Sequence, residues 1–304
     1  MVSPTDYALR AVAADGRILA FAASTAGLCE EARRRHDLWP TAAAAVGRVL
    51  TATALLALPM KEGGVTVRVA GDGPIGGILA DGAPDGGVRG YALQPHVDLP
   101  PRPDGKLDVG GAVGRLGVLR VTRHLPVGLP YTGSVALQSG EIGLDFAAYF
   151  RHSEQVPALV ALGVLVGRRA RVRAAGGLII QLLPGAPAAA AARLEANTRD
   201  IGALSRTLDA GESPEQILVR ALDGFAPRIL ERREVRFHCP CGRRRLARVL
   251  AALPAEQLRS MRLEDDGAEL LCHFCGRKYR FGAADLLKLE WAAGAAGGSR
   301  RGGV

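Results

Sequence analysis

The sequence predicts an α+β fold: a strand-rich N-terminal domain, a helical linker and a small cysteine-bearing module at the C-terminus. Three observations indicate this arrangement. Short β-type segments separated by Gly- and Pro-rich turns are grouped in residues 1–183. Helix-type segments are segregated behind them, which is typical of α+β rather than α/β proteins. Four of the five cysteines then lie close together near the C-terminus.

The N-terminal domain, residues 1–183, is expected to begin with a β-hairpin. Asp15-Gly16 separates the segments YALRAVA and RILAFAA, and Asp-Gly is a strong hairpin signal. A helical stretch runs from about Leu28 to Leu58, and Pro40 is suited to open its second half. The other predicted elements of this domain are short strands at Val65–Ala70, Ile75–Ala80, Val88–Leu93, Leu116–Thr122 and Ser134–Leu137, a helix at Glu141–His152, and buried strands at Leu159–Val166 and Gly177–Leu183.

A helical linker is predicted for residues 184–230, where the composition changes. Pro187 is suited to the first turn of an Ala-rich helix that ends near Leu208. Ser213 can cap a further helix that ends near Leu222. These helices carry apolar residues at helical spacing, and we expect their apolar faces to pack on the N-terminal domain. The residues concerned are Leu194, Ile201, Leu204, Leu208, Ile217, Leu218 and Leu222.

A glycine motif, GDGPIG at residues 71–76, matches the G-x-G-x-x-G pattern of dinucleotide-binding turns. That function requires a helix directly after the turn, because the helix N-terminus binds the pyrophosphate. The following sequence, ILADGAPDGG, cannot form such a helix. We therefore interpret the motif as a tight hairpin turn. No Ser/His/Asp order and no paired-carboxylate pattern is recognisable either, and the sequence predicts a protein that is not an enzyme.

Membrane association and secretion are not expected from the sequence. The longest apolar run, residues 156–167, is far shorter than the ~20 residues that span a bilayer. The N-terminal sequence MVSPTDYALR lacks the apolar core of a secretory signal. The cysteines are clustered rather than spread as a disulfide framework, which favours a reducing compartment. We therefore expect a cytoplasmic protein.

The clustered cysteines lie in the predicted C-terminal module, residues 231–292, ahead of a Gly-rich tail at 293–304 that we expect to be disordered. They occur in FHCPCGRRR, as Cys239 and Cys241, and in LCHFCGRKY, as Cys272 and Cys275. Thirty residues separate the two pairs, and four thiolates can close a tetrahedral zinc site.

The flanking residues add detail to this zinc prediction. The aromatic residues Phe237, Phe274, Tyr279 and Phe281 can form an apolar shell around the metal. His238 and His273 adjoin the cysteines, but four thiolates already fill the site. The sequence thus predicts one zinc ion per chain in the reduced state.

The first pair has one residue fewer than the usual Cys-x-x-Cys. In extended backbone, Cys239 and Cys241 point to the same side and can face one metal ion. Without the metal, a disulfide between them would be strained, and strained disulfides are readily reduced. Cys272 and Cys275 have the spacing of thiol–disulfide exchange motifs. Five basic residues, Arg243, Arg244, Arg245, Arg277 and Lys278, crowd the cysteines and favour thiolates.

Both pairs can therefore bind zinc when reduced and form local disulfides when oxidised. The module is too small for a strong apolar core, so zinc should supply much of its folding free energy. Oxidation should then release the metal and unfold the module. The fifth cysteine, Cys29, stands alone in the helical stretch and is expected to be a partly buried thiol outside this switch.

The charge distribution leaves a second interpretation open. The net charge is +9, and from Arg228 onward 16 Lys/Arg stand against 9 Asp/Glu. A basic zinc-bearing C-terminus is compatible with a zinc-ribbon protein that binds nucleic acid or the ribosome. The lack of two symmetric Cys-x-x-Cys pairs argues against it. A catalytic thiol oxidoreductase would need a thioredoxin-like βαβ setting around Cys272 and Cys275, which the flanking sequence lacks.

The chain resembles the redox-regulated heat shock chaperone family, the 33 kDa chaperonins, over nearly its whole length. It departs from the family pattern at Gly242, where a small hydroxyl residue is expected, and at Cys29, where an apolar residue is usual. The stretches that carry the resemblance are FHCPCGRRR, LCHFCGRKYRF, TAGLCEEARRRHDLWPTAAAAVGR, GGVRGYAL, YTGSVALQSGEIGLDFAAYFRHSEQVPALVALGV and GGLIIQLLPGA.

The resemblance implies a zinc-bound, inactive protein in the reduced state. Oxidation would form the disulfides Cys239–Cys241 and Cys272–Cys275 and release zinc. The linker would then loosen, the protein would form homodimers, and it would hold unfolding client proteins without ATP until ATP-dependent foldase chaperones take them over.

Overall fold

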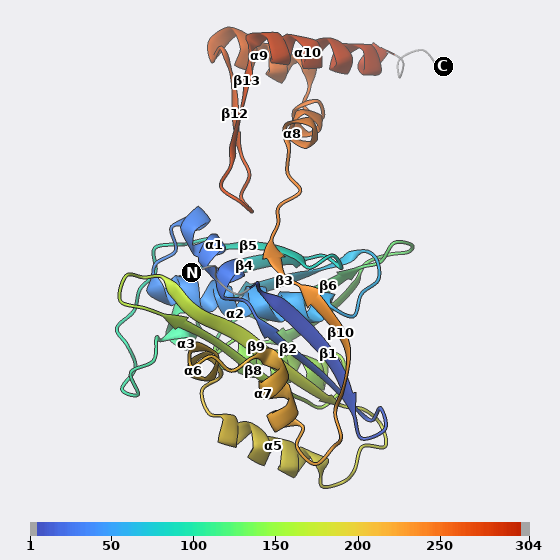
Figure 1. The fold of residues 1–304 in the computed structure, drawn as a ribbon. Helices are drawn as coiled ribbons and strands as arrows, with labels where there is room; N and C mark the ends of the chain where they lie inside the picture. Colours follow the sequence, from blue (N-terminus) through green and yellow to red (C-terminus); the bar gives the residue numbers. More distant parts are fainter. Residues whose placement is uncertain (1–4, 299–304) are drawn as a thin grey trace. The chain divides into compact units, whose positions relative to one another are not determined.

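The computed structural model describes residues 5–298 and confirms the α+β fold class (Figure 1). The chain forms two compact units, one that ends at His238 and one that begins at Cys239. Each unit has its own apolar core, so the two are described in turn.

The first unit contains two β-sheets. The five-stranded sheet has the order β10 (Arg228–Glu234), β1 (Tyr7–Ala13), β2 (Ile18–Ser24), β9 (Val172–Leu182) and β8 (Ala158–Val166). The six-stranded sheet has the order β11 (Arg236–Phe237), β5 (Gly87–Ala92), β4 (Ile78–Gly82), β3 (Gly64–Ala70), β6 (Val118–His124) and β7 (Tyr131–Ala136). All neighbouring strands are antiparallel except β11 and β5.

Helix α2 (Pro40–Ala57) forms the centre of this unit. It packs against β3, β4 and β5 of the six-stranded sheet and against β8 and β9 of the other. All of its residues except Pro40 and Arg48 are buried, as expected for a helix that is apolar on all sides. Among the helices of residues 5–298, it is the one long and apolar enough to cross a membrane, but its burial identifies it as a core helix.

Three more helices surround this core. They are α1 (Ala26–His36), α3 (Val109–Val113) and α4 (Gly143–His152). Helix α1 packs against α2, β5 and β9, whereas α4 packs against β7 and β8.

The predicted linker covers the other face of the five-stranded sheet. It folds into α5 (Ala190–Ile201), α6 (Leu204–Asp209) and α7 (Pro214–Ala221). Their apolar residues form a second core with β1, β2 and β9, which confirms that the linker helices pack on the N-terminal domain. The seven predicted contact residues of the linker are all buried in this core except Leu208, which is half-buried against it.

The second unit is small. It consists of α8 (Arg243–Leu250), α9 (Ala255–Glu264), the hairpin β12 (Gly267–Leu271) and β13 (Lys278–Gly282), and α10 (Ala283–Gly298). Among its described side chains, those of residues 239–291, four are buried in its core: Leu250, Leu258, Phe281 and Leu286. Residues 293–298 of the predicted tail belong to α10, and residues 299–304 lie outside the described part of the chain.

Several local predictions are confirmed. Asp15 and Gly16 form the turn between β1 and β2, both with positive φ. Pro40 opens α2, and Ser213 caps α7 in a capping box with Gln216. The GDGPIG segment is a turn that leads from β3 into β4, with no helix after it.

Two local predictions are wrong. The strand predicted at Ile75–Ala80 begins only at Ile78, because the preceding residues complete the turn, with Gly76 and Gly77 at positive φ. The single helix predicted from Pro187 to Leu208 is two helices. It begins at Ala190 and is broken at Gly202, whose φ of 72° ends a helix.

The N-terminus of α1 is capped from outside the helix. Thr25 at the N-cap makes no capping hydrogen bond with its side chain. Instead, the buried carboxylate of Asp6 accepts a hydrogen bond of 2.6 Å from the Leu28 amide. Burial raises the pKa of Asp6 from 3.8 to about 6, although hydrogen bonds from the amides of Leu28, Gly27 and Ala26 lower it.

We predict that Asp6→Ala lowers the free energy of unfolding of this unit by about 1–2 kcal/mol, the usual cost of a lost cap. Asp6→Asn keeps an acceptor oxygen and should retain most of this stability. The folded state binds the Asp6 proton more tightly than the unfolded state, so the contribution of Asp6 to stability falls as pH rises from about 4 to about 6. Over this range Asp6→Asn should therefore gain stability relative to wild type.

Urea unfolding followed by Trp39 fluorescence, in a Trp291→Phe background, measures both effects within the first unit. A difference between wild type and Asp6→Asn that does not change with pH would contradict the assigned titration.

Candidate metal centre

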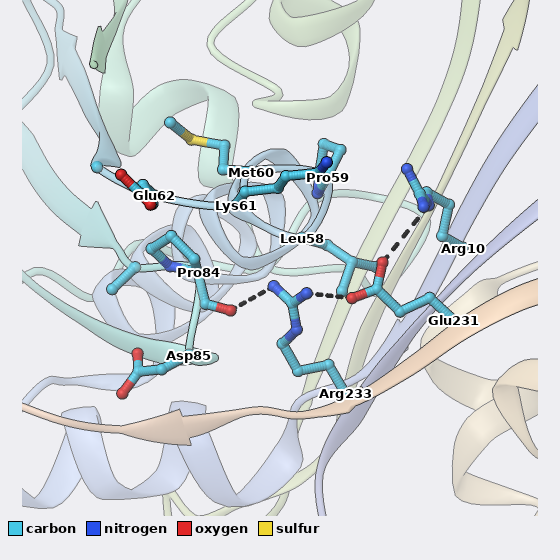
Figure 2. A pocket seen from close by; sticks show the side chains of 12 residues that line it. Arg10, Leu58, Pro59, Met60, Lys61, Glu62, Pro84, Asp85, Glu231 and Arg233 are labelled. Carbon is cyan, nitrogen blue, oxygen red and sulfur yellow. Dashed lines mark hydrogen bonds and ion pairs between the residues drawn. The ribbon is translucent and has the colours of Figure 1, made fainter. Parts of the chain in front are cut away.

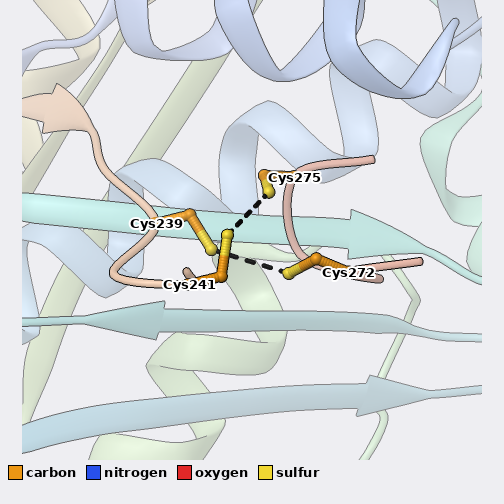
Figure 3. A group of neighbouring side chains, drawn as sticks. All are labelled: Cys239, Cys241, Cys272 and Cys275. Carbon is orange, nitrogen blue, oxygen red and sulfur yellow. Dashed lines mark hydrogen bonds between the residues drawn. The ribbon is translucent and has the colours of Figure 1, made fainter. Parts of the chain in front are cut away.

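The four clustered cysteines come together in the second unit (Figure 3). Cys239 and Cys241 lie in the extended segment before α8, and Cys272 and Cys275 lie in the turn between β12 and β13. The turn is tight because the amides of Cys275 and Gly276 both donate to the Cys272 carbonyl, at 3.2 and 2.8 Å. Gly276, directly after Cys275, has a φ of 68°, which glycine adopts without steric cost. Gly242, directly after Cys241, has a φ of −169° and is extended, so a residue that tolerates positive φ is needed after only one of the two pairs.

The sulfur atoms form a compact cluster. All four lie within 4.8 Å of one another. Cys239 Sγ is 3.7 Å from Cys272 Sγ, and Cys241 Sγ is 3.3 Å from Cys275 Sγ. A tetrahedral site with zinc–sulfur bonds of ~2.3 Å needs sulfur–sulfur distances of about 3.8 Å. The donor set and its spacing therefore fit one zinc ion, and all four cysteines are free thiols.

The four sulfurs differ in how readily they ionise. Burial opposes ionisation of Cys241, but hydrogen bonds from Tyr279 and from the other three cysteines lower its pKa to about 7. Burial raises the pKa of Cys272, and it raises that of Cys275 to about 12. Cys241 is thus the first thiolate of the metal-free cluster, and a bound cation would have to displace protons from its neighbours.

The residues predicted to surround the cluster divide into different roles. Tyr279 contacts it through its hydroxyl group, 3.2 Å from Cys241 Sγ. Phe281, however, lies in the apolar core of the module. Phe237 lies in the first unit, where its ring packs 5.0 Å from the Arg35 guanidinium, so its assignment to the metal shell is wrong. No sequence pattern indicates this placement, because Phe237 is only two residues from Cys239.

One of the predicted basic neighbours does not face the sulfurs. Arg243 hydrogen-bonds to Asp285 Oδ2 at 2.6 Å and stacks on the Phe281 ring at 4.4 Å. Arg277 does contribute positive charge to the cluster: a hydrogen bond with Tyr279 and the nearby charges of Tyr279, Cys241 and Cys275 raise its pKa.

Cys29 belongs to the core of the first unit. It is fully buried rather than partly buried, because its Sγ packs where α1 meets Gly47 of α2 and lies 3.6 Å from the Gly47 carbonyl oxygen. Burial raises the pKa of the Cys29 thiol to about 12. A thiol that is both inaccessible and protonated is unreactive.

Comparisons with known proteins all point to one family. The family model described as "Hsp33 protein" matches residues 6–282. The chain is 50% identical to a 33 kDa chaperonin of Symbiobacterium thermophilum over 287 residues, which cover 94% of this chain and 97% of that protein. It is 46% identical to a 33 kDa chaperonin of Desulforamulus reducens over 93% of this chain and 97% of that protein.

A solved structure shares the fold. It is the crystal structure of a 33 kDa chaperonin, or heat shock protein 33 homolog, from Thermotoga maritima, with a TM-score of 0.88 and 31% sequence identity. The match covers 96% of this chain and 99% of that one.

We predict that the reduced protein binds one zinc ion through these four cysteines and that the double variant Cys272→Ser, Cys275→Ser loses nearly all of it. Each serine removes a thiolate ligand, and two thiolates cannot complete the site. Metal content by atomic emission, with a chelator competition, measures the loss. Cys29→Ala is the matched control and should bind zinc like wild type.

The chelator competition, repeated at several pH values, should show that zinc affinity rises with pH near 7, because protonated thiols must lose their protons to bind the metal. Stoichiometric zinc in the double variant would contradict the assigned ligand set.

Proposed function

This chain belongs to the Hsp33 protein family of heat-shock chaperones, and from that premise we propose that it is an ATP-independent holdase of the cytoplasm, activated by oxidation of its cysteine cluster. The observation that carries the proposal is the four-cysteine cluster in a unit with a very small apolar core. In this proposal residues 231–292 are the redox switch, 184–230 the linker and 1–183 the chaperone domain.

The reduced module would be held together by its sulfurs. Bound zinc would supply cross-links between the segment before α8 and the turn between β12 and β13. The four buried side chains of the module core leave much of the folding free energy to these cross-links. Cys239, Cys241, Cys272 and Cys275 would be the ligands, all as thiolates.

Oxidation would convert these ligands into disulfides. Each pair of thiolates, Cys239–Cys241 and Cys272–Cys275, would give two electrons to a two-electron oxidant such as hydrogen peroxide, which would also take up two protons from solvent. The peroxide would leave as two water molecules, and one S–S bond would form. A disulfide sulfur is no longer an anionic ligand, so the cluster loses its metal affinity and the module loses its main stabilisation.

The linker would transmit this loss to the first unit. Its helices pack on the five-stranded sheet through one face only, and its far end continues through β10 and β11 into Cys239. Release of that end would loosen α5, α6 and α7 and expose apolar surface, which is what unfolded chains bind. Activated molecules would form homodimers, hold unfolded clients and pass them to ATP-dependent foldase chaperones.

The nucleic-acid alternative has weaker support. Four of the ten basic side chains between Arg243 and Lys288 form ion pairs: Arg243 with Asp285, Arg262 with Glu290, and both Lys278 and Arg280 with Glu269. Ion-paired arginines offer less net charge to a phosphate backbone.

Light scattering of a thermally unfolding client protein tests the proposal. Protein treated with hydrogen peroxide at heat-shock temperature should suppress aggregation without ATP, and protein treated with reductant and zinc should not. Equal activity in both states would exclude redox control, and no activity in either would exclude a holdase.

We predict that mild oxidation forms Cys272–Cys275 before Cys239–Cys241, because the Cys-x-x-Cys pair closes a larger and less strained ring. Peptide mapping by mass spectrometry of partly oxidised protein measures the order. Two short sulfur–sulfur distances, of 3.7 and 3.3 Å, lie across the pairs, so Cys239–Cys272 and Cys241–Cys275 are the competing products. Their accumulation, or the reverse order, would contradict the prediction.

We also predict that residues 184–230 lose hydrogen-exchange protection together with the module when the protein is oxidised. A chain that ends at Arg236 should suppress aggregation without any oxidant, since it lacks all four clustered cysteines. If that chain is folded but inactive, and the linker of the oxidised protein stays protected, the linker does not transmit the signal.

A further inference from the structure

The segment just before Cys239 connects the edges of the two sheets of the first unit. We call residues 228–238 the strap; it is drawn in orange in Figure 1 and contains β10 and β11. Strand β10 is the edge strand of the five-stranded sheet and pairs antiparallel with β1. Strand β11 is the edge strand of the six-stranded sheet and pairs parallel with β5. The strap therefore covers an edge of each sheet.

Main-chain hydrogen bonds hold most of the strap. Three further amides of the strap also pair with the body of the unit. Those of Val235, Arg236 and His238 donate to the carbonyls of Asp6, Gly86 and Val88, at 2.9, 3.0 and 2.9 Å. Its side chains contribute little burial: Val235 is buried, whereas Ile229 and Leu230 are 43% and 42% exposed. Main-chain pairing is independent of sequence, so another extended chain could make the same bonds.

Side-chain contacts add specificity to the strap. Arg232 stacks on the Tyr7 ring at 4.0 Å and Arg236 pairs with Asp85 at 2.9 Å. Two further contacts are made with arginines. Glu231 Oε2 lies 3.5 Å from Arg10 Nε, which is buried and has no hydrogen-bond partner. Six residues later, the Phe237 ring packs on the Arg35 guanidinium. An acidic residue and an aromatic residue therefore meet two arginines that belong to the body of the unit.

The strap also forms one wall of a cavity of about 780 Å³ (Figure 2). Its walls come from the end of α2, the turn between β4 and β5, β1 and the strap itself, and include Leu58, Met60, Pro84, Arg10, Glu231 and Arg233. Figure 2 shows Glu231 between Arg10 and Arg233, and Arg233 also donates to the Pro84 carbonyl. Removal of the strap would open this cavity along the β1 edge.

We propose that the strap occupies the binding site of an extended client segment, and that client chains replace it by adding a strand to β1 and β5 after activation. The proposal rests on the proposed function for the release of the strap, since the strap continues directly into the cysteine module. The preferred client segment is unfolded and extended, with an acidic side chain for Arg10 and an aromatic one six residues later for Arg35. Strand addition gives affinity through the main chain and modest selectivity through these two contacts.

The test uses a labelled peptide with the strap sequence, PRILERREVRFH, and fluorescence anisotropy with the full-length protein. Oxidised protein should bind it at least 10-fold more tightly than reduced, zinc-loaded protein, in which the strap fills the site. An excess of peptide should also restore client aggregation. The matched control peptide has the same side chains but N-methyl groups on alternate amides, which removes strand donors, and it should bind at least 10-fold more weakly.

The aromatic contact is tested by a double-mutant cycle. Arg35→Ala should weaken binding of the parent peptide about 3- to 10-fold, the size of a cation–π contact. It should not weaken binding of a peptide in which the Phe is replaced by Ala. Arg34→Ala is the matched control on the protein. Arg34 and Arg35 both pair with Glu31, but the Arg34 side chain is 64% exposed and does not contact the strap.

Two results would overturn the proposal: equal binding of the N-methylated peptide, or no peptide binding and no competition by oxidised protein that still suppresses aggregation. The second result would contradict the strap proposal and leave the proposed function standing, since the oxidised protein without peptide reports the holdase activity in the same assay. Loss of that activity without peptide would instead contradict the proposed function.

Discussion

The size of the C-terminal core is the constraint on which the rest of the structure depends. The four side chains buried among its described residues, Leu250, Leu258, Phe281 and Leu286, cannot give a 66-residue unit a large folding free energy. In the proposed mechanism, the folded state of this unit depends on metal bound by the sulfur cluster, where segments more than 30 residues apart converge within 4.8 Å. Chemistry at four atoms is thereby coupled to the folding of a whole unit.

The first unit distributes its stability unevenly. Helix α2 is buried between the two sheets, and the close approach of Gly47 to Cys29 and Val164 leaves no room for rearrangement there. The linker helices and the strap, in contrast, have solvent on one side. Partial opening of these outer elements would leave the central helix and both sheets intact, because local unfolding starts where few side chains are buried.

Sequence patterns predicted the parts of the molecule that local chemistry determines. Asp15-Gly16, Pro40 and the cysteine spacing each specify a turn, a helix start or a donor set by themselves. The strap could not be predicted, since RILERREVRF has no strand periodicity and is ordered by the β1 and β5 edges that it pairs with. The same holds for Phe237, whose neighbour is Arg35, about 200 residues earlier in the chain.

The strap is ordered by the sheet edges it pairs with and not by its own sequence, and this bears on how a chaperone can recognise many different chains. A binding site built from side-chain pockets selects sequences, whereas sheet edges select only extended backbone. An exposed edge is also an aggregation hazard, which proteins commonly cover. In this chain the cover is the segment that leads into the cysteine-bearing unit, so in the proposed mechanism the hazard would be exposed only when that unit unfolds. Covering an edge with a strand of mostly exposed side chains keeps the cover removable, since little apolar burial opposes its release.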